Sequence, residues 1–301
     1  MRILITGGSG FIGRNLVEQL ASTYQVLAPS SAELDLLKDR DVREYLRAHR
    51  CDVVVHAATT RSNRRVAAPP DLLDRNCRMF FNLARNADRF GKMIHFGSGA
   101  EYDRVQLPPM VKEVYFDTRV PSDAYGFSKY LCAKHIERSE RIVNLRLFGV
   151  FGPYEDYTVR FISNACCRAL KGLPIVLRQD VLFDYLYVGD LARITSWFID
   201  NDARHKAYNV CTGQPVALTK LARLVADISE RDPRISVMTG GMAAQYTGDN
   251  SRLLAEIGRY QFSDGRAAIS ELFSWHEQRQ SRIDIESLRF DEDTRTTVAG
   301  G

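Results

Sequence analysis

The sequence predicts an α/β fold: a Rossmann-type doubly wound parallel sheet with a smaller C-terminal substrate-binding region. Short apolar runs alternate with stretches of helical periodicity from the first residue onwards. The runs are continuous rather than alternating, which is typical of parallel strands buried on both faces. A continuous apolar run is also compatible with a buried helix, but the shortness of these runs and the glycines that follow favour strands.

The N-terminal half carries this alternation most regularly. The expected strands are residues 2–6, 25–28, 51–57, 92–97 and 142–148, and the expected helices are 12–20, 42–48, 72–90 and 124–139. Repeated strand–helix units of this kind build a parallel sheet covered by helices on both faces. We therefore assign residues 1–155 to a dinucleotide-binding domain.

The rhythm changes after Gly152-Pro153. Helices are expected at 160–170, 191–199, 218–228 and 253–257, and strands at 175–177, 183–188 and 207–210. We expect residues 183–212 to return to the first domain, and residues 156–182 and 213–290 to form the substrate-binding region. Residues 291–301 are polar and aperiodic, which predicts a disordered tail.

Composition favours a soluble globular protein. Hydrophobic residues make up 45% of the chain, charged residues 26%, and the formal net charge is only +4. Basic residues are spread along the chain, so no nucleic-acid partner is predicted. The densest basic cluster, Arg61, Arg64 and Arg65, is interpreted as a solvated loop in preference to a docking site.

The six cysteines show no spacing typical of a metal site and lie in apolar stretches. This pattern is typical of reduced core thiols, so we expect a cytoplasmic protein without a metal. The N-terminus reads directly as a strand, which predicts no signal peptide. No apolar run approaches the roughly 20 residues that span a bilayer, so no membrane segment is predicted.

A glycine-rich loop joins the first strand to the first helix. Residues 6–13 read TGGSGFIG, which places Gly7, Gly10 and Gly13 in a GxxGxxG pattern. Glycines in this context permit a tight turn, close approach of a pyrophosphate and close packing of helix on strand. The alternative is an ordinary tight turn. The candidate cofactor contacts in this loop are Gly7, Ser9, Gly10, Phe11, Ile12 and Gly13.

The end of the second expected strand lacks the acidic residue that usually binds the adenosine ribose. It reads Ala-Pro-Ser-Ser at residues 28–31, and Ser30 offers a hydroxyl without a repelling charge. Arg14 is positioned in the sequence to reach a 2′-phosphate, or else is a solvated helix residue. We therefore expect NADP as cofactor, with NAD as the alternative. Asp35 and Leu36 are candidate contacts to the adenine.

Tyr125 and Lys129 stand four residues apart at the start of an expected helix, and hence on one face. A phenol is a poor acid at neutral pH unless a nearby ammonium stabilises the phenolate. Ser98 ends an expected strand, where its hydroxyl can hold a substrate oxygen beside Tyr125. A Tyr-x-x-x-Lys pair alone arises by chance, but the glycine loop and Ser98 make chance a poor explanation. Asn76, inside an expected helix, is either exposed or, as we favour, a buried organiser of backbone hydrogen bonds.

The chain resembles the extended short-chain dehydrogenase/reductases of the nucleotide-sugar epimerase, dehydratase and reductase group. The matching segments are TGGSGFIG at 6–13, HAA at 56–58, Ser98 with Tyr102, Tyr125 with Lys129, LRLFGVFGP at 145–153 and YLYVGDL at 185–191. The resemblance covers residues 1 to about 195. It implies an NAD(P)-binding Rossmann domain and a C-terminal region that binds a sugar nucleotide.

The same resemblance implies site residues and an assembly. Ser98, Tyr125 and Lys129 become the catalytic triad, and Ala57, Ala58 and Phe148 become cofactor contacts. Asn76 is a further candidate cofactor contact, independent of the resemblance. As in many relatives, the helices at 72–90 and 124–139 would form a homodimer interface.

Departures from the family pattern narrow the reaction. Dehydratases carry a Thr-Asp-Glu run where this chain has Ser98, Gly99 and Ala100, and reductases that also epimerise need a cysteine just after the serine. This chain resembles the latter enzymes in ELDLL at 33–37 but offers no such thiol. A pure reductase or a simple 4-epimerase remains. Glu101 is expected to point away from Ser98 if the strand alternation continues, unless a turn reverses it.

Two further departures concern the substrate pocket. The arginine that family members use for the nucleotide diphosphate is replaced by Phe183, and a frequent asparagine is replaced by Gly149. Arg160 and Arg178 are candidates to bind the diphosphate instead, or are surface residues. The expected substrate contacts are thus Ser98, Gly149, Arg160 and Arg178.

Our leading hypothesis is NAD(P)H-dependent reduction of a nucleoside-diphosphate 4-keto-6-deoxy sugar, with hydride delivered to carbon 4 and Tyr125 as proton donor. The second is a nucleotide-sugar 4-epimerase with tightly bound NAD. A third, of another class, is a non-catalytic dinucleotide-binding regulator, which would have little reason to keep the three catalytic residues together.

Overall fold

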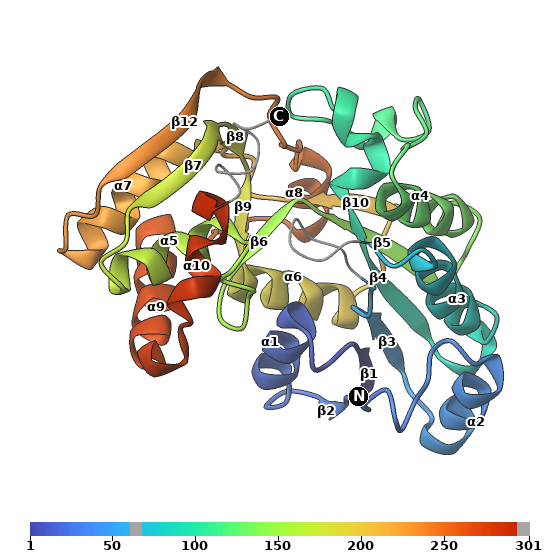
Figure 1. Cartoon of the computed structure of the whole chain (residues 1–301). Helices are drawn as coiled ribbons and strands as arrows, with labels where there is room; N and C mark the ends of the chain where they lie inside the picture. Colours follow the sequence, from blue (N-terminus) through green and yellow to red (C-terminus); the bar gives the residue numbers. More distant parts are fainter. Residues whose placement is uncertain (61–67, 294–301) are drawn as a thin grey trace.

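The computed structural model describes residues 1–60 and 68–293, and it has an α/β architecture (Figure 1). A six-stranded parallel sheet lies at its centre, in the order β10-β5-β4-β3-β1-β2. Its strands are β1 (Arg2–Thr6), β2 (Gln25–Leu27), β3 (Val53–His56), β4 (Lys92–Ser98), β5 (Ile142–Leu147) and β10 (Ala207–Val210). The predicted parallel sheet of Rossmann type is therefore confirmed.

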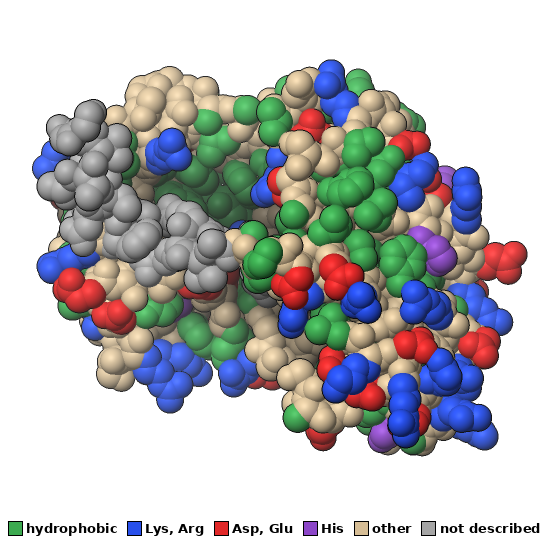
Figure 2. Space-filling view, turned by 45° about the vertical axis from the view of Figure 1, so that its right-hand side comes forward, with side chains coloured by type: hydrophobic (Ala, Val, Ile, Leu, Met, Phe, Trp, Pro, Cys, Tyr) green, Lys and Arg blue, Asp and Glu red, His purple; other side chains and the backbone are tan. Residues whose placement is uncertain are grey.

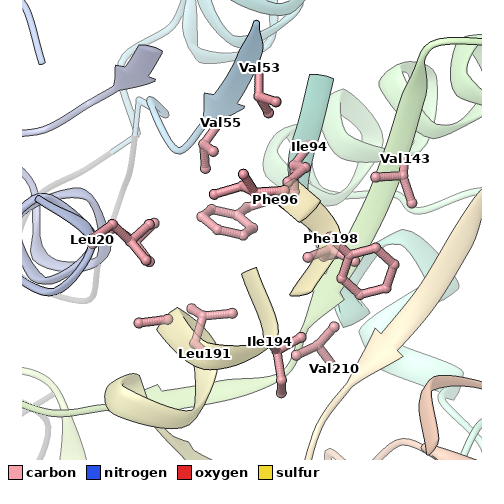
Figure 3. Packing of buried hydrophobic residues seen from close by; sticks show 14 of the residues in the cluster. Leu20, Val53, Val55, Ile94, Phe96, Val143, Leu191, Ile194, Phe198 and Val210 are labelled. Carbon is pink, nitrogen blue, oxygen red and sulfur yellow. The ribbon is translucent and has the colours of Figure 1, made fainter. Parts of the chain in front are cut away.

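Helices cover both faces of this sheet because successive strand residues point to opposite sides. Ile3 and Ile5 belong to the core cluster beneath α1 (Phe11–Leu20) and α6 (Val188–Asp200), where Figure 3 shows Leu20 and Leu191 turned toward Val55 and Phe96. Leu4 belongs to the opposite cluster. That cluster lies beneath α2 (Asp39–His49), α3 (Leu72–Ala84) and α4 (Ala124–Ile136).

A second lobe, on the left in Figure 1, has a core of its own. Its helices α5 (Phe161–Leu170) and α7 (Leu218–Ser229) pack against the parallel pair β7 (Ile175–Asp180) and β12 (Ile235–Met242). The helices α9 (Gly265–Glu277) and α10 (Ile285–Asp293) pack in turn on α5. Short pairs join the lobes: β6 (Gly149–Phe151) with β9 (Tyr185–Tyr187), and β8 (Leu182–Phe183) with β11 (Val216–Ala217). The helix α8 (Ser251–Ile257) packs on β10.

Two long helices end earlier than the sequence predicts. The helix expected at 72–90 stops at Ala84, because the Asn86 side chain donates to the Asn82 carbonyl and a separate 3-10 turn follows. The helix expected at 124–139 stops at Ile136, and the next backbone bonds, from Arg138 and Ser139, span three residues instead of four.

The strand expected at 183–188 is also wrong. It is interrupted at Asp184, whose carboxylate accepts hydrogen bonds from Thr212 and the Gly213 backbone, so β8 and β9 are separate. The helix expected from residue 191 begins earlier, at Val188. β12, α9 and α10 were not predicted, although Ala268, Ile269, Leu272 and Phe273 give α9 an apolar face at helical spacing.

The predicted disordered tail at 291–301 is corrected at its start, because α10 extends to Asp293. Residues 294–301 and the cluster Arg61, Arg64 and Arg65 lie outside the described residues. All six cysteines are free thiols, and all except Cys77 are buried. Within residues 1–60 and 68–293, no helix is long and apolar enough to cross a membrane.

The helices α3 and α4 pack side by side (Figure 1). The homodimer expected through this pair stays a prediction. On the face shown in Figure 2, Lys and Arg side chains are interspersed with Asp and Glu over the right-hand part, without a large area of one sign.

Candidate active site

The sheet's connectivity places the site. The chain leaves β1 toward β2 on one side and later returns to place β3 on the other, so a crevice opens at the carboxyl ends of these strands. A cavity of about 790 Å³ lies there. Its lining comes from the β1–α1 loop, the ends of β3 and β4, the start of α4 and the segment 244–246. Figure 2 shows a recess with hydrophobic side chains on its walls.

The glycine loop forms one wall of the cavity. Gly7 has φ +71°. The turn from Gly7 to Gly10 is closed by a hydrogen bond from the Gly10 N–H to the Gly7 carbonyl. A Cβ on Gly7 would lie 2.8 Å from the Ala58 backbone, and one on Gly13 would collide with the Gly7 carbonyl. Gly7, Gly10, Phe11, Ile12 and Gly13 all line the cavity.

This wall suits a pyrophosphate. The helix α1 begins at Phe11 without a side-chain cap or an acidic residue in its first turn. Its first N–H groups therefore have no partner within the helix, and they carry the positive end of the helix dipole. The residues present fit a dinucleotide cofactor.

The expected 2′-phosphate contacts are placed differently. Arg14 pairs with Glu18 at 3.3 Å, covers the ring of Tyr154 and does not line the cavity. Ser9, which was expected as a cofactor contact in the glycine loop, is exposed and does not line the cavity either. The Ser30 N–H and hydroxyl donate to Glu33 Oε2 at 2.8 and 2.9 Å. These two hydrogen bonds lower the pKa of Glu33, and the bond from the Ser30 N–H has the larger effect. The expectation that the segment after β2 offers no carboxylate is wrong, because the Glu33 side chain folds back onto Ser30.

Asp35 and Leu36 do not reach the cavity either. Asp35 accepts from the Leu37 N–H and pairs with Lys38, while Leu36 is buried among the side chains beneath α2 and α3. Their predicted adenine contacts find no support in this arrangement.

Asn76 is buried and organises its surroundings, as we favoured. Its side chain accepts from the Thr60 N–H at 2.7 Å, donates to the Thr60 carbonyl and donates to Ser128 in α4. It thus ties the segment after β3 to the helix that carries Tyr125. Ala57 and Thr59 line the cavity, whereas Ala58 packs against Gly7.

Ser98, Tyr125 and Lys129 are brought together on the cavity wall. Asp123 caps α4 by accepting from the Gly126 N–H at 2.9 Å, which fixes the start of the helix beside the end of β4. Lys129 is 6% exposed and donates from Nζ to the Phe96 carbonyl at 2.7 Å. One face of α4 therefore presents both the phenol and the ammonium to the residues at the end of β4.

The histidines behind Lys129 stay neutral. Burial, and then the charge of Lys129, lower the pKa of His56 to about 3. Its Nδ1 lies 2.8 Å from the Thr6 hydroxyl. Burial likewise lowers the pKa of His95. The ammonium of Lys129 thus carries positive charge in a place where its imidazole neighbours carry none.

Glu101 does not follow the strand alternation past Ser98, because β4 ends there and a 3-10 turn, Gly99–Tyr102, takes over. Its buried carboxylate accepts from the Ser98 N–H at 2.9 Å and pairs with Arg146 at 2.6 Å. Asn144 donates to the same carboxylate. Glu101 is engaged in fixing the Ser98 backbone and is turned toward β5, away from the cavity.

The substrate side of the cavity differs from the prediction. Arg160 lines it beside Val159, but Arg178 is exposed on β7 and lies outside the lining. Gly149 is buried beneath Phe183, whose ring would lie 2.7 Å from a Cβ at this position. Phe148 and Phe183 themselves line the cavity.

Sequence reasoning missed several lining residues. Arg104 and Asp123 form an ion pair of 3.2 Å at the cavity, and Ala244, Gln245 and Tyr246 reach it from the C-terminal lobe. Tyr246 is bridged by its backbone to Phe183 and places its hydroxyl 3.4 Å from Ser98 Oγ. No motif or period in the sequence marks this segment, since only the fold brings it to Ser98.

Fold and site together define a class: Rossmann-type enzymes that use a nicotinamide dinucleotide. The part of the chain that the structure describes holds no group of three or more His, Cys, Asp or Glu able to bind a metal ion. The model of the NAD-dependent epimerase/dehydratase family matches residues 3–211. The chain belongs to this family.

Similar proteins are found among both sequences and solved structures. The chain is 23% identical over 252 residues to GDP-L-colitose synthase of Yersinia pseudotuberculosis, covering 76% of this chain and 82% of that protein. It is 26% identical over 299 residues to GDP-6-deoxy-D-talose 4-dehydrogenase of Aggregatibacter actinomycetemcomitans, covering 91% and 97%. A GDP-L-fucose synthetase of Naegleria fowleri bound to NADP has a similar fold, with a TM-score of 0.81, 18% identity and coverage of 93% and 94%.

Proposed function

We propose that this protein reduces the 4-keto group of a nucleoside-diphosphate 4-keto-6-deoxy sugar with NADPH, with NADH as the alternative donor. One observation carries the proposal. Ser98, Tyr125 and Lys129 line one cavity, while the two residues after Ser98, Gly99 and Ala100, have no side chain that could act as an acid or a base. The relatives named GDP-L-colitose synthase and GDP-6-deoxy-D-talose 4-dehydrogenase support a GDP-linked sugar as the substrate class.

Gly99 argues against a dehydratase for a geometric reason. A Cβ there would lie 2.7 Å from Phe148 and 2.8 Å from the Tyr246 hydroxyl, so the space that a carboxylate side chain needs is filled. Loss of water from a hexose requires a group that removes a proton beside the ketone and a group that protonates the departing hydroxyl. Glu101, the nearest acid after Ser98, is paired with Arg146.

The residues divide the reduction as follows. The bound nicotinamide supplies the hydride for carbon 4. Tyr125 gives its phenolic proton to the oxygen on that carbon, and the ammonium of Lys129 stabilises the phenolate that remains. Ser98 holds the same oxygen with a hydrogen bond, which strengthens as negative charge develops on it.

The cavity also offers cations for the nucleotide diphosphate. Arg160 lies at the N-terminal boundary of α5, Arg104 pairs with Asp123 at the start of α4, and both line the cavity. A guanidinium matches the geometry of phosphate oxygens and can bind two of them at once. We assign the diphosphate to Arg160 and leave Arg178 without a role in binding.

The test is a reduction assay on the purified full-length chain. GDP-, UDP- and dTDP-linked 4-keto-6-deoxyhexoses are each incubated with NADPH, and we expect at least one to consume the cofactor and yield the deoxyhexose by mass spectrometry. The matching unmodified hexose nucleotides with NAD should lose no water. If water is lost from any of them, or if no keto sugar is reduced, the proposal is wrong.

A 4-epimerase is the second candidate, favoured by one observation. The carboxylate of Glu33 at the end of β2 suits the free ribose hydroxyls of NAD better than a 2′-phosphate. An epimerase keeps its NAD through the catalytic cycle. NAD released when the purified protein is denatured, together with interconversion of two hexose nucleotides, would establish this alternative.

A further inference from the structure

Tyr246 reaches the catalytic centre from the other lobe. Its backbone N–H donates to the Leu182 carbonyl at 3.1 Å, which fixes the segment against β8. Its ring lies between Phe148 and Phe183, each at a centroid distance of 5.2 Å. Its hydroxyl lies 3.4 Å from Ser98 Oγ. Both the backbone and the ring of Tyr246 are thus held in place, and its hydroxyl lies beside that of Ser98.

The hydrogen bonds of Ser98 can be counted. A serine hydroxyl has one proton to donate and two lone pairs that accept. The Ala100 N–H donates to one of these lone pairs at 3.2 Å. If Tyr246 donates to the other, both lone pairs are occupied, and the serine proton is free to point at a third oxygen.

We propose that the Tyr246 hydroxyl donates to Ser98 Oγ and thereby turns the Ser98 proton toward the oxygen on the reacting carbon. This rests on the proposed function, in which Ser98 holds that oxygen. Tyr246 acts through Ser98 and is a positioning residue, so no proton leaves it during the reaction. It makes Ser98 a donor at the moment when negative charge grows on the substrate oxygen.

The surroundings favour Tyr246 as the donor. Burial raises the pKa of Tyr246, so its proton stays in place throughout the neutral range. In the reverse arrangement, Ser98 would donate its only hydroxyl proton to Tyr246 and would have none left for the substrate. Ser98 would then have nothing but a lone pair to offer a carbonyl oxygen, which itself can only accept.

The first arm of the test is kinetic. Tyr246→Phe removes the donor but keeps the ring, so we expect kcat to fall about tenfold while KM changes less than about twofold. In a Ser98→Ala background the same change should have no further effect on kcat. Tyr185→Phe is the matched control, because the Tyr185 ring stacks on Phe183 at 4.6 Å within the same aromatic group. Multiplicative losses in the double variant, or an unchanged kcat in Tyr246→Phe, would overturn the proposal.

The second arm needs no substrate, so it separates this inference from the proposed function. Melting temperatures are measured for the wild type, Ser98→Ala, Tyr246→Phe and the double variant. If the two side chains share a hydrogen bond, the melting temperature of the double variant should fall by less than the sum of the decreases in the two single variants. Strictly additive losses would mean that the bond does not exist. A wild type that reduces no keto sugar would sink the proposed function, while the thermal cycle would still decide whether Tyr246 and Ser98 share a hydrogen bond.

Discussion

The ring of Phe183 fills the space that a side chain at Gly149 would need. The Phe183 ring lies where a side chain at position 149 would begin, with two of its carbons within 2.9 Å of that Cβ. The Asp184 carbonyl lies 2.6 Å from the same point and accepts a hydrogen bond from the Gly149 N–H. With Phe183 in place of the expected arginine, the asparagine expected at position 149 has no room for its side chain.

This pairing predicts the effect of restoring the asparagine. Gly149→Asn should lower the free energy of unfolding by about 1–3 kcal/mol, the usual cost of overpacking. Adding Phe183→Ala should recover only part of the loss, since the Asp184 carbonyl remains. Gly240→Asn serves as the control, because no atom of the described residues lies within 4 Å of a Cβ there. Chemical denaturation measures all of them, and a fully stable Gly149→Asn would show that the ring moves aside freely.

Tyr125→Phe tests the proton donor. The change removes the hydroxyl and keeps the ring, so NADPH should still bind with near-normal affinity. Turnover should fall by about 100-fold or more, the usual scale for general acid–base groups. Steady-state rates and cofactor titration by fluorescence measure the two quantities. The exposed Tyr115→Phe should behave as the wild type. Near-normal turnover in Tyr125→Phe would assign the proton to another residue.

Glu33 should influence the choice between NADPH and NADH. Its carboxylate lies on Ser30, where a 2′-phosphate would come close, and two like charges repel by about 1 kcal/mol at contact distance in water. Glu33→Gln should therefore raise kcat/KM for NADPH relative to NADH by about fivefold. Glu44→Gln, whose carboxylate pairs with Arg40 on α2, is the control. An unchanged ratio would show that Glu33 faces away from the bound cofactor.

Buried histidines should make the protein sensitive to mild acid. The pKa values of His56 and His276 fall to about 3 and about 4 in the folded state, mainly through burial, and burial also depresses that of His95. The unfolded chain, with histidine pKa near 6.5, therefore binds more protons below this pH, and stability must fall as pH falls. His56 and His276 should each lower the free energy of unfolding by about 2 kcal/mol at pH 5, and His95 acts in the same direction.

Denaturation curves at pH 7 and pH 5 measure this loss. His95→Leu should reduce it, because leucine binds no proton and neither ring nitrogen of His95 has a hydrogen-bond partner among the described residues. Equal stability at the two pH values would contradict the folded-state values on which the prediction rests.

The first half of the fold was predictable because its signals are local. Continuous apolar runs such as Ile3 to Ile5 must be buried on both faces, and only helices on both sides of a parallel sheet achieve this. Element ends were less predictable. Asn86 and Asp184 interrupt a helix and a strand through hydrogen bonds that a periodic pattern does not contain.

The site divides in the same way. The glycine loop and the Tyr125–Lys129 pair were predictable from the sequence, because backbone freedom and helical spacing are properties of neighbouring residues. The remaining contacts of the site arise from the tertiary fold. Glu101 is neutralised by Arg146 from the next strand, Glu33 folds back on Ser30, and Tyr246 arrives at Ser98 from 148 residues away. Such contacts depend on how separate elements pack, and no local pattern of residues encodes them.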